Sequence, residues 1–282
     1  MYLYSNQKMK KIRISSSISN FREKLLKRTK LEEWRWNIFT PTLFVGMYHW
    51  GDIIRFILQF GKKKVFFCGS DIKKIPWWFS LISTNTKYYC ENDIEQEVLM
   101  KKGIYAEVLP MIFTEFESKN CLKPSKKIHV YLTMHEGREE EYGMDVINTI
   151  SRKLPDITFH IYGQKFPPLI ELVESLTSKL SLKFTNVIFH GKVHEEQFNK
   201  EIRNYHCALR LNEFDGFSET VAKSILLGQY PITKIKYPKL WNYDSIDSLI
   251  ERLNSLKYML KGNPYRLWWK KELDENLEKL LK

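Results

Sequence analysis

The chain has 282 residues, of which 43% are hydrophobic and 14% aromatic, a composition typical of a folded protein long enough for two domains. No apolar run approaches the roughly 18–20 residues that span a bilayer, and no apolar core follows the N-terminal cations as it would in a secretory signal. The four cysteines (Cys68, Cys90, Cys121 and Cys207) lack the spacing of a disulfide frame or a zinc site. They favour reduced thiols and a cytoplasmic protein.

The net charge of +12 is concentrated in the first half of the chain. Residues 1–126 carry 22 Lys+Arg and 12 Asp+Glu, which leaves 23 and 21 of the total 45 and 33 for the remainder. The basic half therefore favours an anionic partner, which can be an anionic acceptor, a membrane surface or nucleic acid. A general lysine bias of the source genome is the competing explanation.

The first half of the sequence predicts strands that alternate with helices. A basic amphipathic helix is predicted over 19–36, with Phe21, Leu25, Leu26 and Leu31 on one side. Predicted strands and helices then follow one another, with strands at 42–48, 63–68, 86–90 and 104–110 and helices at 50–60, 76–82 and 93–102. This alternation indicates a parallel sheet that is covered on both faces.

The second half repeats the alternation after a polar linker at 114–126. Strands are predicted at 127–133, 157–162, 186–190, 206–211 and 230–233, helices at 143–153, 168–180, 195–204 and 218–227, and tail helices at 244–260 and 264–282. We therefore expect an α/β protein with two Rossmann-like domains, over residues 1–120 and 121–243, followed by C-terminal helices over 244–282. Ligands of such domains bind at the carboxyl ends of the strands, which predicts an interdomain cleft.

The segment 213–228, EFDGFSETVAKSILLG, has a turn with Gly216 that leads into a helix ending at Gly228. The first backbone N–H groups of a helix lack partners, and the helix dipole adds about half a positive charge there. The pattern predicts an anion site suited to a diphosphate. A purely structural turn with a capped helix is the competing interpretation.

The order of these segments resembles that of GT-B glycosyltransferases, specifically the retaining glycosyltransferase family 4, over residues 40–240. Three stretches carry the resemblance: VFFCGSDI at 65–72, NVIFHGKVHEEQFN at 186–199 and LRLNEFDGFSETVAKSILLG at 209–228. The resemblance implies a GT-B fold with a shortened N-terminal domain and a last helix that packs back on that domain. It also implies a nucleoside diphosphate sugar as co-substrate, bound by the second domain, and transfer with retention and without a metal or other cofactor.

The resemblance assigns roles to particular residues. Asp215 matches the first acidic residue of the motif, and Gly216, Phe217 and Ser218 match the turn that meets the donor sugar and diphosphate. From the charge of the helix start we also expect diphosphate contacts at Glu219 and Thr220, helped by two cations, Arg138 and Lys223.

Three positions depart from the family pattern. Lys223 stands where the family has a ribose-binding glutamate, Cys68 replaces a histidine, and Tyr142 replaces a lysine. Lys223 follows Glu219 by four residues, so an ion pair between them on one helix face is the favoured alternative to a phosphate contact.

Strand ends supply further candidates. Asp71 and His49 each follow a predicted strand and are candidates to orient an acceptor hydroxyl, although Asp71 also fits a turn cap and His49 a surface residue. Arg210 and Asn212 flank the glycine turn and are donor-pocket candidates. No group of His, Cys and Asp has metal-ligand spacing, so no metal is predicted.

Two adjacent aromatic pairs, Trp77-Trp78 and Trp268-Trp269, lie next to lysines, and packing at a domain junction is the favoured interpretation of the second pair. Trp77 and Trp78 follow Lys73 and Lys74, and these rings, like the helix predicted over 19–36, suit a membrane interface. Packing at a domain junction is the alternative.

The sequence therefore predicts a glycosyltransferase, of the hexosyltransferase class, that moves a sugar from a nucleoside diphosphate sugar to a hydroxyl acceptor in glycan, lipid or glycoprotein assembly. We expect it in the cytoplasm, peripheral on the inner membrane face. One alternative is an inactive nucleotide-sugar-binding homologue, and another is a glycosyltransferase of modified DNA. A nucleic-acid partner ranks last because no DNA-reading motif is present. The oligomeric state is left open.

Overall fold

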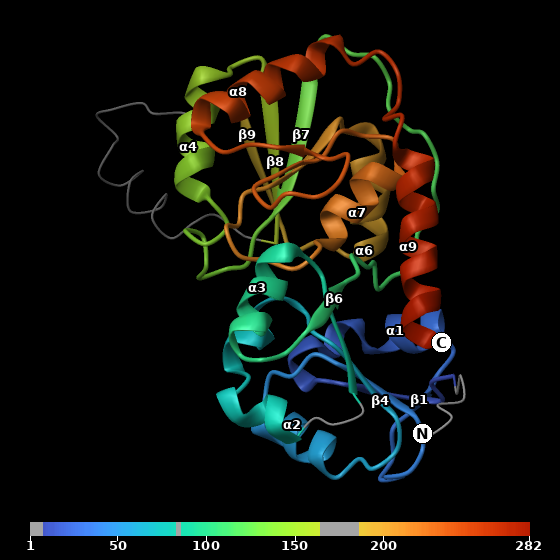
Figure 1. Cartoon of the computed structure of the whole chain (residues 1–282). Coiled ribbons are helices and arrows are strands. Elements are labelled where there is room, and N and C mark those ends of the chain that lie inside the picture. The colour runs from blue at the N-terminus through green and yellow to red at the C-terminus, as the bar shows by residue number, and fades with distance from the viewer. Residues whose placement is uncertain (1–7, 83–85, 164–185) are drawn as a thin grey trace. The chain divides into compact units, whose positions relative to one another are not determined.

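A computed structural model describes residues 8–82, 86–163 and 186–282 (Figure 1). The chain divides into two compact units, each described by itself. Unit 1 comprises Met1–Phe116, Phe214–Glu219 and Lys270–Lys282, and unit 2 comprises Glu117–Glu213 and Thr220–Trp269. Phe214–Glu219 thus groups with unit 1, whereas the sequence placed it in the second domain. The helix predicted over 168–180 lies outside the described residues.

Unit 1 is built on a parallel sheet with the strand order β2-β1-β3-β4-β5-β6. Its strands are β1 (Lys11–Ile14), β2 (Glu32–Glu33), β3 (Thr42–Val45), β4 (Lys63–Phe66), β5 (Thr86–Cys90) and β6 (Ala106–Val108). Its helices are η1 (Ser16–Phe21), α1 (Arg22–Thr29), α2 (Trp50–Ile57), η2 (Gly69–Lys74), η3 (Trp77–Ile82) and α3 (Asp93–Lys101). The parallel α/β prediction is confirmed, but β1 and β2 are not in the predicted set because each is too short to show a clear period of two.

The helix predicted over 19–36 is wrong in extent. α1 ends at Thr29, and Lys30 adopts the left-handed conformation (φ 56°) that commonly ends a helix, before the chain enters β2. Its apolar residues pack inside unit 1, where Leu25 is buried and Phe21 and Leu26 lie against the same core cluster.

Both faces of the unit 1 sheet are covered. Ile12 and Leu43 point into a cluster shared with α1 and with the end of helix α9 (Arg266–Leu281). Phe44 and Val65 point into the opposite cluster, which α2, η2, η3 and α3 complete. Alternation along each strand sends successive side chains to these two faces.

Unit 2 is built on a second parallel sheet, with the order β12-β11-β10-β7-β8-β9. Its strands are β7 (Ile128–Thr133), β8 (Ile157–Tyr162), β9 (Val187–Gly191), β10 (Cys207–Arg210), β11 (Ile232–Thr233) and β12 (Trp241–Asn242). Its helices are α4 (Met144–Lys153), α6 (Glu195–Glu201), η4 (Ile202–Asn204), α7 (Glu219–Leu226), α8 (Ile246–Ser255) and η5 (Leu256–Tyr258). The β12 strand is a further element that the sequence pattern did not predict.

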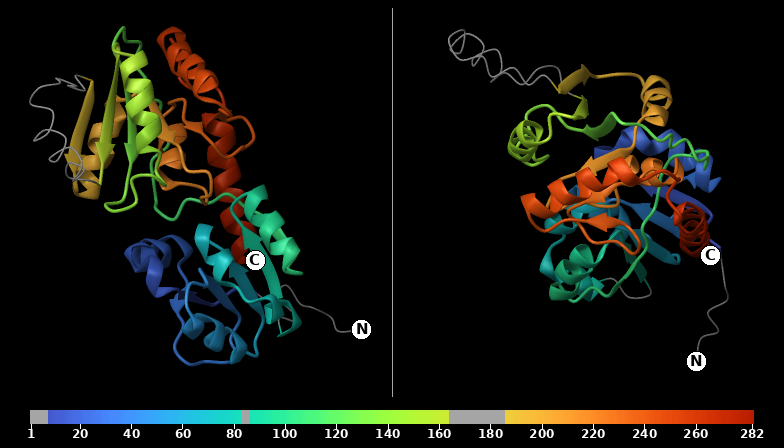
Figure 2. Two further views of the ribbon diagram at one scale, coloured as in Figure 1. Left: turned by 90° about the vertical axis from the view of Figure 1, so that its left-hand side faces the viewer. Right: turned by 90° about the horizontal axis from the view of Figure 1, so that it is seen from above.

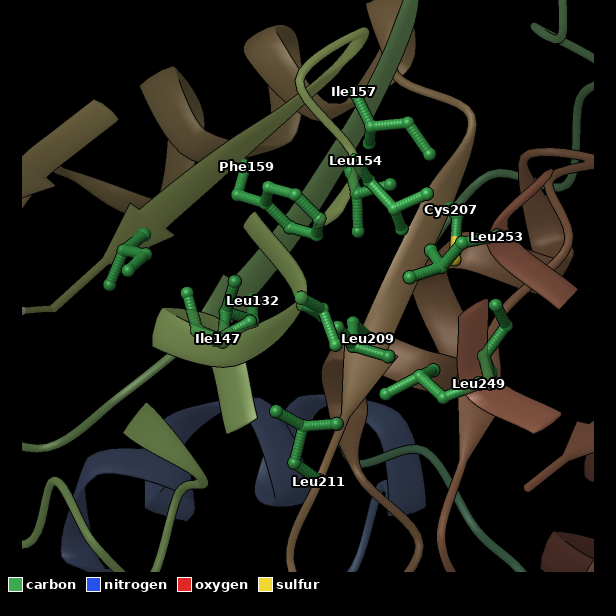
Figure 3. Close-up of a cluster of buried hydrophobic side chains, with 14 of the residues drawn as sticks. Leu132, Ile147, Leu154, Ile157, Phe159, Cys207, Leu209, Leu211, Leu249 and Leu253 are labelled. Carbon is green, nitrogen blue, oxygen red and sulfur yellow. The ribbon is translucent and has the colours of Figure 1, made fainter. Parts of the chain in front are cut away.

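The core of unit 2 lies between its sheet and helices α4 and α8. Figure 3 shows Leu209 of β10 among side chains that include Ile147 of α4 and Leu249 of α8, and all three are at most 1% exposed. The other face of the sheet meets α6 and α7, where Ser224 Oγ accepts a 3.2 Å hydrogen bond from Ala208 N. Figure 2 gives two further views of these layers.

The strand orders locate a topological switch point in each unit. In unit 2 the chain builds β8 and β9 on one side of β7 and then crosses back to add β10 on the other side. In unit 1 it builds β2 on one side of β1 and β3 on the other. Ligands of open parallel α/β sheets bind at the carboxyl ends of the strands at such a point, because the diverging connections leave a crevice there.

Candidate functional site

The switch point of unit 2 brings together polar groups from three elements. Thr133 ends β7, Arg210 ends the neighbouring β10, and Thr220 lies in the first turn of α7. Arg210 Nη1 lies 3.4 Å from Thr133 Oγ1, and the hydroxyls of Thr133 and Thr220 are 3.2 Å apart. A guanidinium, two hydroxyls and a helix start therefore converge where this fold binds ligands.

An aromatic ring supports the arginine at this point. The Arg210 guanidinium lies 4.8 Å from the centre of the Tyr142 ring, a cation–π distance. Tyr142 is itself buried, so its ring is a fixed support for Arg210. Arg138 lies farther from the same ring, at 5.7 Å, and is paired with Glu141 through a 3.0 Å bond from Nε.

Asn212 contributes a buried acceptor near the same strand end. The residue is 6% exposed, and its Oδ1 has no hydrogen-bond partner among the described residues. A buried acceptor without a partner costs about 1–3 kcal/mol, which a ligand N–H or hydroxyl would recover. Arg210 and Asn212, both predicted donor-pocket residues, thus lie at the carboxyl end of β10, at the switch point.

Lys223 has a different partner from the one predicted. It is 5% exposed, and its ammonium bonds to Glu195 Oε1 at 2.9 Å and to Asn199 Oδ1 at 3.0 Å, both on α6. The predicted pair with Glu219 is wrong, because Glu219 instead accepts hydrogen bonds from the backbone and hydroxyl of Thr114. The Lys223 ammonium therefore links α7 to α6. Because both of these partners lie on α6, the arrangement does not favour a contact between Lys223 and a phosphate.

The turn at Gly216 contacts the carboxylate of Glu91, a residue of the same chain. Within unit 1, Asn92 Nδ2 donates a 2.7 Å hydrogen bond to Asp215 O, and the Phe217 N–H donates to the Glu91 carboxylate. A Cβ atom on Gly216 would lie 1.8 Å from Glu91 Oε2, so the close approach requires glycine. Glu91 therefore lies at the turn where the sequence predicted a diphosphate. Ser218 is half-buried.

Three buried acidic side chains gather at the carboxyl ends of β4 and β5. Asp71, Glu91 and Glu95 are each at most 4% exposed, and burial raises the pKa of all three, that of Asp71 to about 7. Asp71 accepts hydrogen bonds from Met47 N at 2.8 Å and Cys68 N at 3.0 Å, which is the geometry of a turn cap. Sequence reasoning missed the two glutamates, although Glu91 directly follows a predicted strand and Asp71 comes only three residues after another.

His49 lies at the switch point of unit 1. It follows β3, is exposed, and its Nε2 lies 2.7 Å from Ser17 Oγ in η1, which follows β1. Beneath it, Asp52 accepts a 2.6 Å hydrogen bond from Ser15 Oγ and pairs with Arg13 at 3.5 Å. His49 is thus the more accessible of the two predicted acceptor residues.

Unit 2 also holds a row of histidines that sequence reasoning did not find. His160 Nε2 lies 2.9 Å from His129 Nδ1, and His160 Nδ1 lies 2.9 Å from His190 Nε2, so the row crosses β7, β8 and β9. Burial, with the neighbouring His129 and His190, lowers the pKa of His160 to about 3. No group of three or more His, Cys, Asp or Glu side chains within residues 8–82, 86–163 and 186–282 is arranged to hold a metal ion.

Unit 1 contains a pocket of about 640 Å³ that is lined by strands β4 to β6 and by the end of α9. Lys64 of β4, Lys87 of β5 and Glu107 of β6 line it together with Lys279 of α9. Lys64 donates 2.9 Å hydrogen bonds to the carbonyls of Lys279 and Leu280, and burial lowers its pKa to about 8. The pocket lies at the opposite edge of the sheet from the switch point, and Lys64 serves there as a cap for α9.

Comparison with solved structures shows the fold of the whole chain. A glycosyltransferase from Rickettsia africae has a TM-score of 0.61 at 10% identity, with 98% of this chain and 95% of that chain covered. The lipopolysaccharide outer core galactosyltransferase WaaB gives 0.60 at 13% identity over 94% and 81% of the two chains. Anabaena HepE in complex with UDP and glucose gives 0.57 at 10% identity over 92% and 79%. The expected GT-B fold is thereby confirmed.

Comparisons with known sequences gave no match, and some of the structural matches are to much longer proteins. No protein-family model matches the sequence, and no curated protein matches it. The chain is also similar in structure to TarM and to pneumococcal GtfA, but spans only 52% and 55% of their lengths.

Proposed function

We propose that the protein is a glycosyltransferase that transfers a sugar from a nucleoside diphosphate sugar, with UDP as the first nucleotide to test, to a hydroxyl acceptor. The observation that carries the proposal is the convergence of Arg210, Thr133 and Thr220 with the unsatisfied Oδ1 of Asn212 at the switch point of unit 2. The fold shared with WaaB and with UDP-bound HepE supports the same reading.

In this proposal Arg210 stabilises the negative charge of the leaving group. As the bond to the anomeric carbon breaks, negative charge grows on the departing diphosphate, and a prepositioned guanidinium stabilises it more than it stabilises the ground state. The Tyr142 ring keeps Arg210 in place, so little reorganisation is needed. The amide oxygen of Asn212 would accept a hydrogen bond from the sugar or the nucleotide.

On the acceptor side, His49 is the proposed residue to orient or deprotonate the attacking hydroxyl, since it is exposed at the switch point of unit 1. Asp71 would position the turn that precedes η2, because backbone N–H groups occupy its carboxylate. Asp215 and the Gly216 turn remain proposed sugar contacts. Retention, a hexose as the transferred sugar and transfer without a metal remain part of the proposal through the family resemblance. A cytoplasmic location remains proposed from the four free cysteines.

A second candidate function is nucleotide-sugar binding without transfer. It is favoured by the replacement of the family's glutamate with Lys223, whose ammonium holds α6 to α7 and offers no acceptor to a ribose. Binding without turnover would support this candidate.

A thermal-shift series with UDP, GDP, ADP and their sugars tests the donor site. A ligand at a hundred times its dissociation constant should add about 2.7 kcal/mol to the free energy of unfolding. Arg210→Ala should weaken that ligand by about 10- to 100-fold, the range for a lost charge-assisted hydrogen bond.

Arg252→Ala is the matched control, because Arg252 of α8 is an exposed arginine whose guanidinium lies 5.8 Å from the ring of Trp241 in the edge strand β12, which β11 and β10 separate from β7. It should bind the ligand as the wild type does. If no nucleotide shifts the melting temperature, or if both variants bind equally well, the assignment of the donor site fails. Release of labelled sugar from the bound donor then separates the transferase from the binding homologue.

A further inference from the structure

Helix α2 of unit 1 is apolar on both sides. Ile53 and Phe56 are buried against the sheet, whereas Trp50, Ile54 and Ile57 on its outer side are 64%, 53% and 41% exposed. A helix that is apolar all round is normally covered on every side, because exposed apolar surface is costly in water. Within the residues that the structure describes, the outer side of α2 therefore has no covering layer.

The exposed apolar surface continues beyond both ends of α2. At its start, the Trp50 ring stacks on Trp78 at 5.9 Å, next to the outward-facing Trp77 and Leu81 of η3. Beyond its end, Phe60 lies 6.1 Å from Phe39, and both rings are about 70% exposed. We call this surface of α2, η3 and the Phe39–Phe60 pair the aromatic patch. It is larger than the scattered single apolar residues that are normal on a protein surface.

The segment that carries the aromatic patch presents a net positive charge to solvent, although two of its seven cations, Lys63 and Lys64, are buried. Residues 34–82 contain seven Lys or Arg and only two acids, Asp52 and Asp71. Both acids are buried, at 2% and 0% exposure, so the charge that this segment presents to solvent is positive. Lys73 and Lys74 are exposed immediately before η3, and Arg55 lies on α2 itself.

We infer that the aromatic patch docks unit 1 onto an anionic membrane surface. Aromatic and aliphatic side chains would enter the boundary between headgroups and acyl chains, while the lysines and arginines meet the lipid phosphates. Each cation near an anionic surface is worth about a fivefold gain in binding. No helix in the described ranges is long and apolar enough to cross a bilayer, so docking would be at the surface. The inference does not rest on the transferase activity.

The surface differs from the one that the sequence indicated first. The apolar side of α1 is buried within unit 1, so the predicted amphipathic helix over 19–36 offers no membrane face. The Trp77 side chain, in contrast, is 75% exposed and belongs to the aromatic patch.

Vesicle binding of the full chain, without nucleotide or acceptor, tests the inference. The wild type should cosediment with phosphatidylcholine vesicles containing phosphatidylglycerol and much less with phosphatidylcholine alone. The double variant Ile54→Ser, Trp77→Ser should reduce binding at least tenfold, and Lys73→Glu, Lys74→Glu should remove the preference for the anionic vesicles. Brominated lipids should quench the tryptophan fluorescence of the wild type more strongly than that of a Trp50→Phe, Trp77→Phe variant.

Leu260→Ser is the control variant, because Leu260 is 67% exposed in unit 2 and lies outside the aromatic patch. It should bind vesicles as the wild type does, and all variants should keep the wild-type melting temperature because every altered side chain is exposed. Equal binding by the patch variants and the control overturns the inference, and so does wild-type binding that ignores lipid charge. Self-association that Trp77→Ser abolishes, without vesicle binding, would instead assign the patch to a second copy of the chain.

Discussion

At the scale of single residues, a buried lysine shows how sequence spacing can mislead. Lys223 and Glu219 are four residues apart on one helix, which favours an ion pair, but the lysine reaches across to Glu195 of α6. It does so because Glu219 lies at the helix start, where its carboxylate satisfies the backbone of Phe113 and Thr114. Lys223 is therefore a structural cation that joins α6 to α7.

We predict that Lys223→Ala lowers the free energy of unfolding by about 2 kcal/mol. Removing one member of a fully buried pair costs about 3–5 kcal/mol, and the figure is smaller here because the Glu195 side chain is 37% exposed. Urea unfolding measures the loss. Lys192→Ala is the control, because Lys192 is 75% exposed and its pair with Glu136 should contribute less than about 0.5 kcal/mol. Equal losses in the two variants would contradict the structural role, as would loss of nucleotide binding without loss of stability.

At the scale of elements, the hydrogen bonds around the row of His129, His160 and His190 indicate which ring nitrogen of His160 carries the proton. Tyr162 donates to Glu201, so its oxygen accepts from the Tyr205 hydroxyl, whose own oxygen lies 3.2 Å from His160 Nδ1. Nδ1 of His160 therefore carries the proton, and Nε2 accepts from His129. A second proton on His160 would face the N–H of His129, so keeping this link between β7 and β8 would require His129 to change its tautomer.

The histidines of the row, together with His206, predict that the free energy of unfolding of unit 2 falls in acid. The folded-state pKa values of His129, His160, His190 and His206 all lie below the usual value of 6.5, principally because of burial. The unfolded chain consequently binds more protons below pH 6.5, and stability falls as the pH falls, by up to about 1.4 kcal/mol per pH unit for His160 and by less for the other three. His160→Gln should make the dependence between pH 7 and 5 shallower in urea titrations. His194→Gln, at an exposed histidine, should leave it unchanged, and equal slopes in the two variants would refute the assignment.

At the scale of the whole molecule, unit 1 buries acidic side chains whereas unit 2 buries basic ones. Unit 1 buries Asp71, Glu91 and Glu95, whose pKa values are raised by burial, whereas unit 2 buries the histidines. A carboxylate with a raised pKa binds its proton more tightly in the folded state, so it favours folding as the pH falls from about 7 toward 4. The histidines act in the opposite sense over nearly the same range.

We therefore expect acidification from pH 7 to pH 5 to raise the stability of unit 1 and to lower that of unit 2. Hydrogen exchange resolved by peptide measures both in one experiment, since protected amides in β3 to β5 report on unit 1 and those in β7 to β9 on unit 2. Slower exchange in the first group and faster exchange in the second, after correction for the intrinsic rates, is the expected result. A change of the same sign in both groups would contradict it.

The alternation of apolar strands with helices was enough to predict parallel α/β architecture, because strand and helix periods are local properties. The same local signal placed Arg210 and Asn212 at a strand end. It failed where elements were short, as for β1, which four residues define, and where a left-handed Lys30 ended a helix early.

The tertiary structure alone decided which distant groups meet. The crossover at β7 puts Arg210 beside Thr133, and the pleat puts His129, His160 and His190 on one face, although each pair is separated by 30 or more residues. Burial likewise depends on packing: Asp71 and Lys223 look like surface residues in the sequence, yet both are enclosed. Sequence periodicity determines which side of an element faces the core, but contacts across a sheet depend on strand order, which no local pattern encodes.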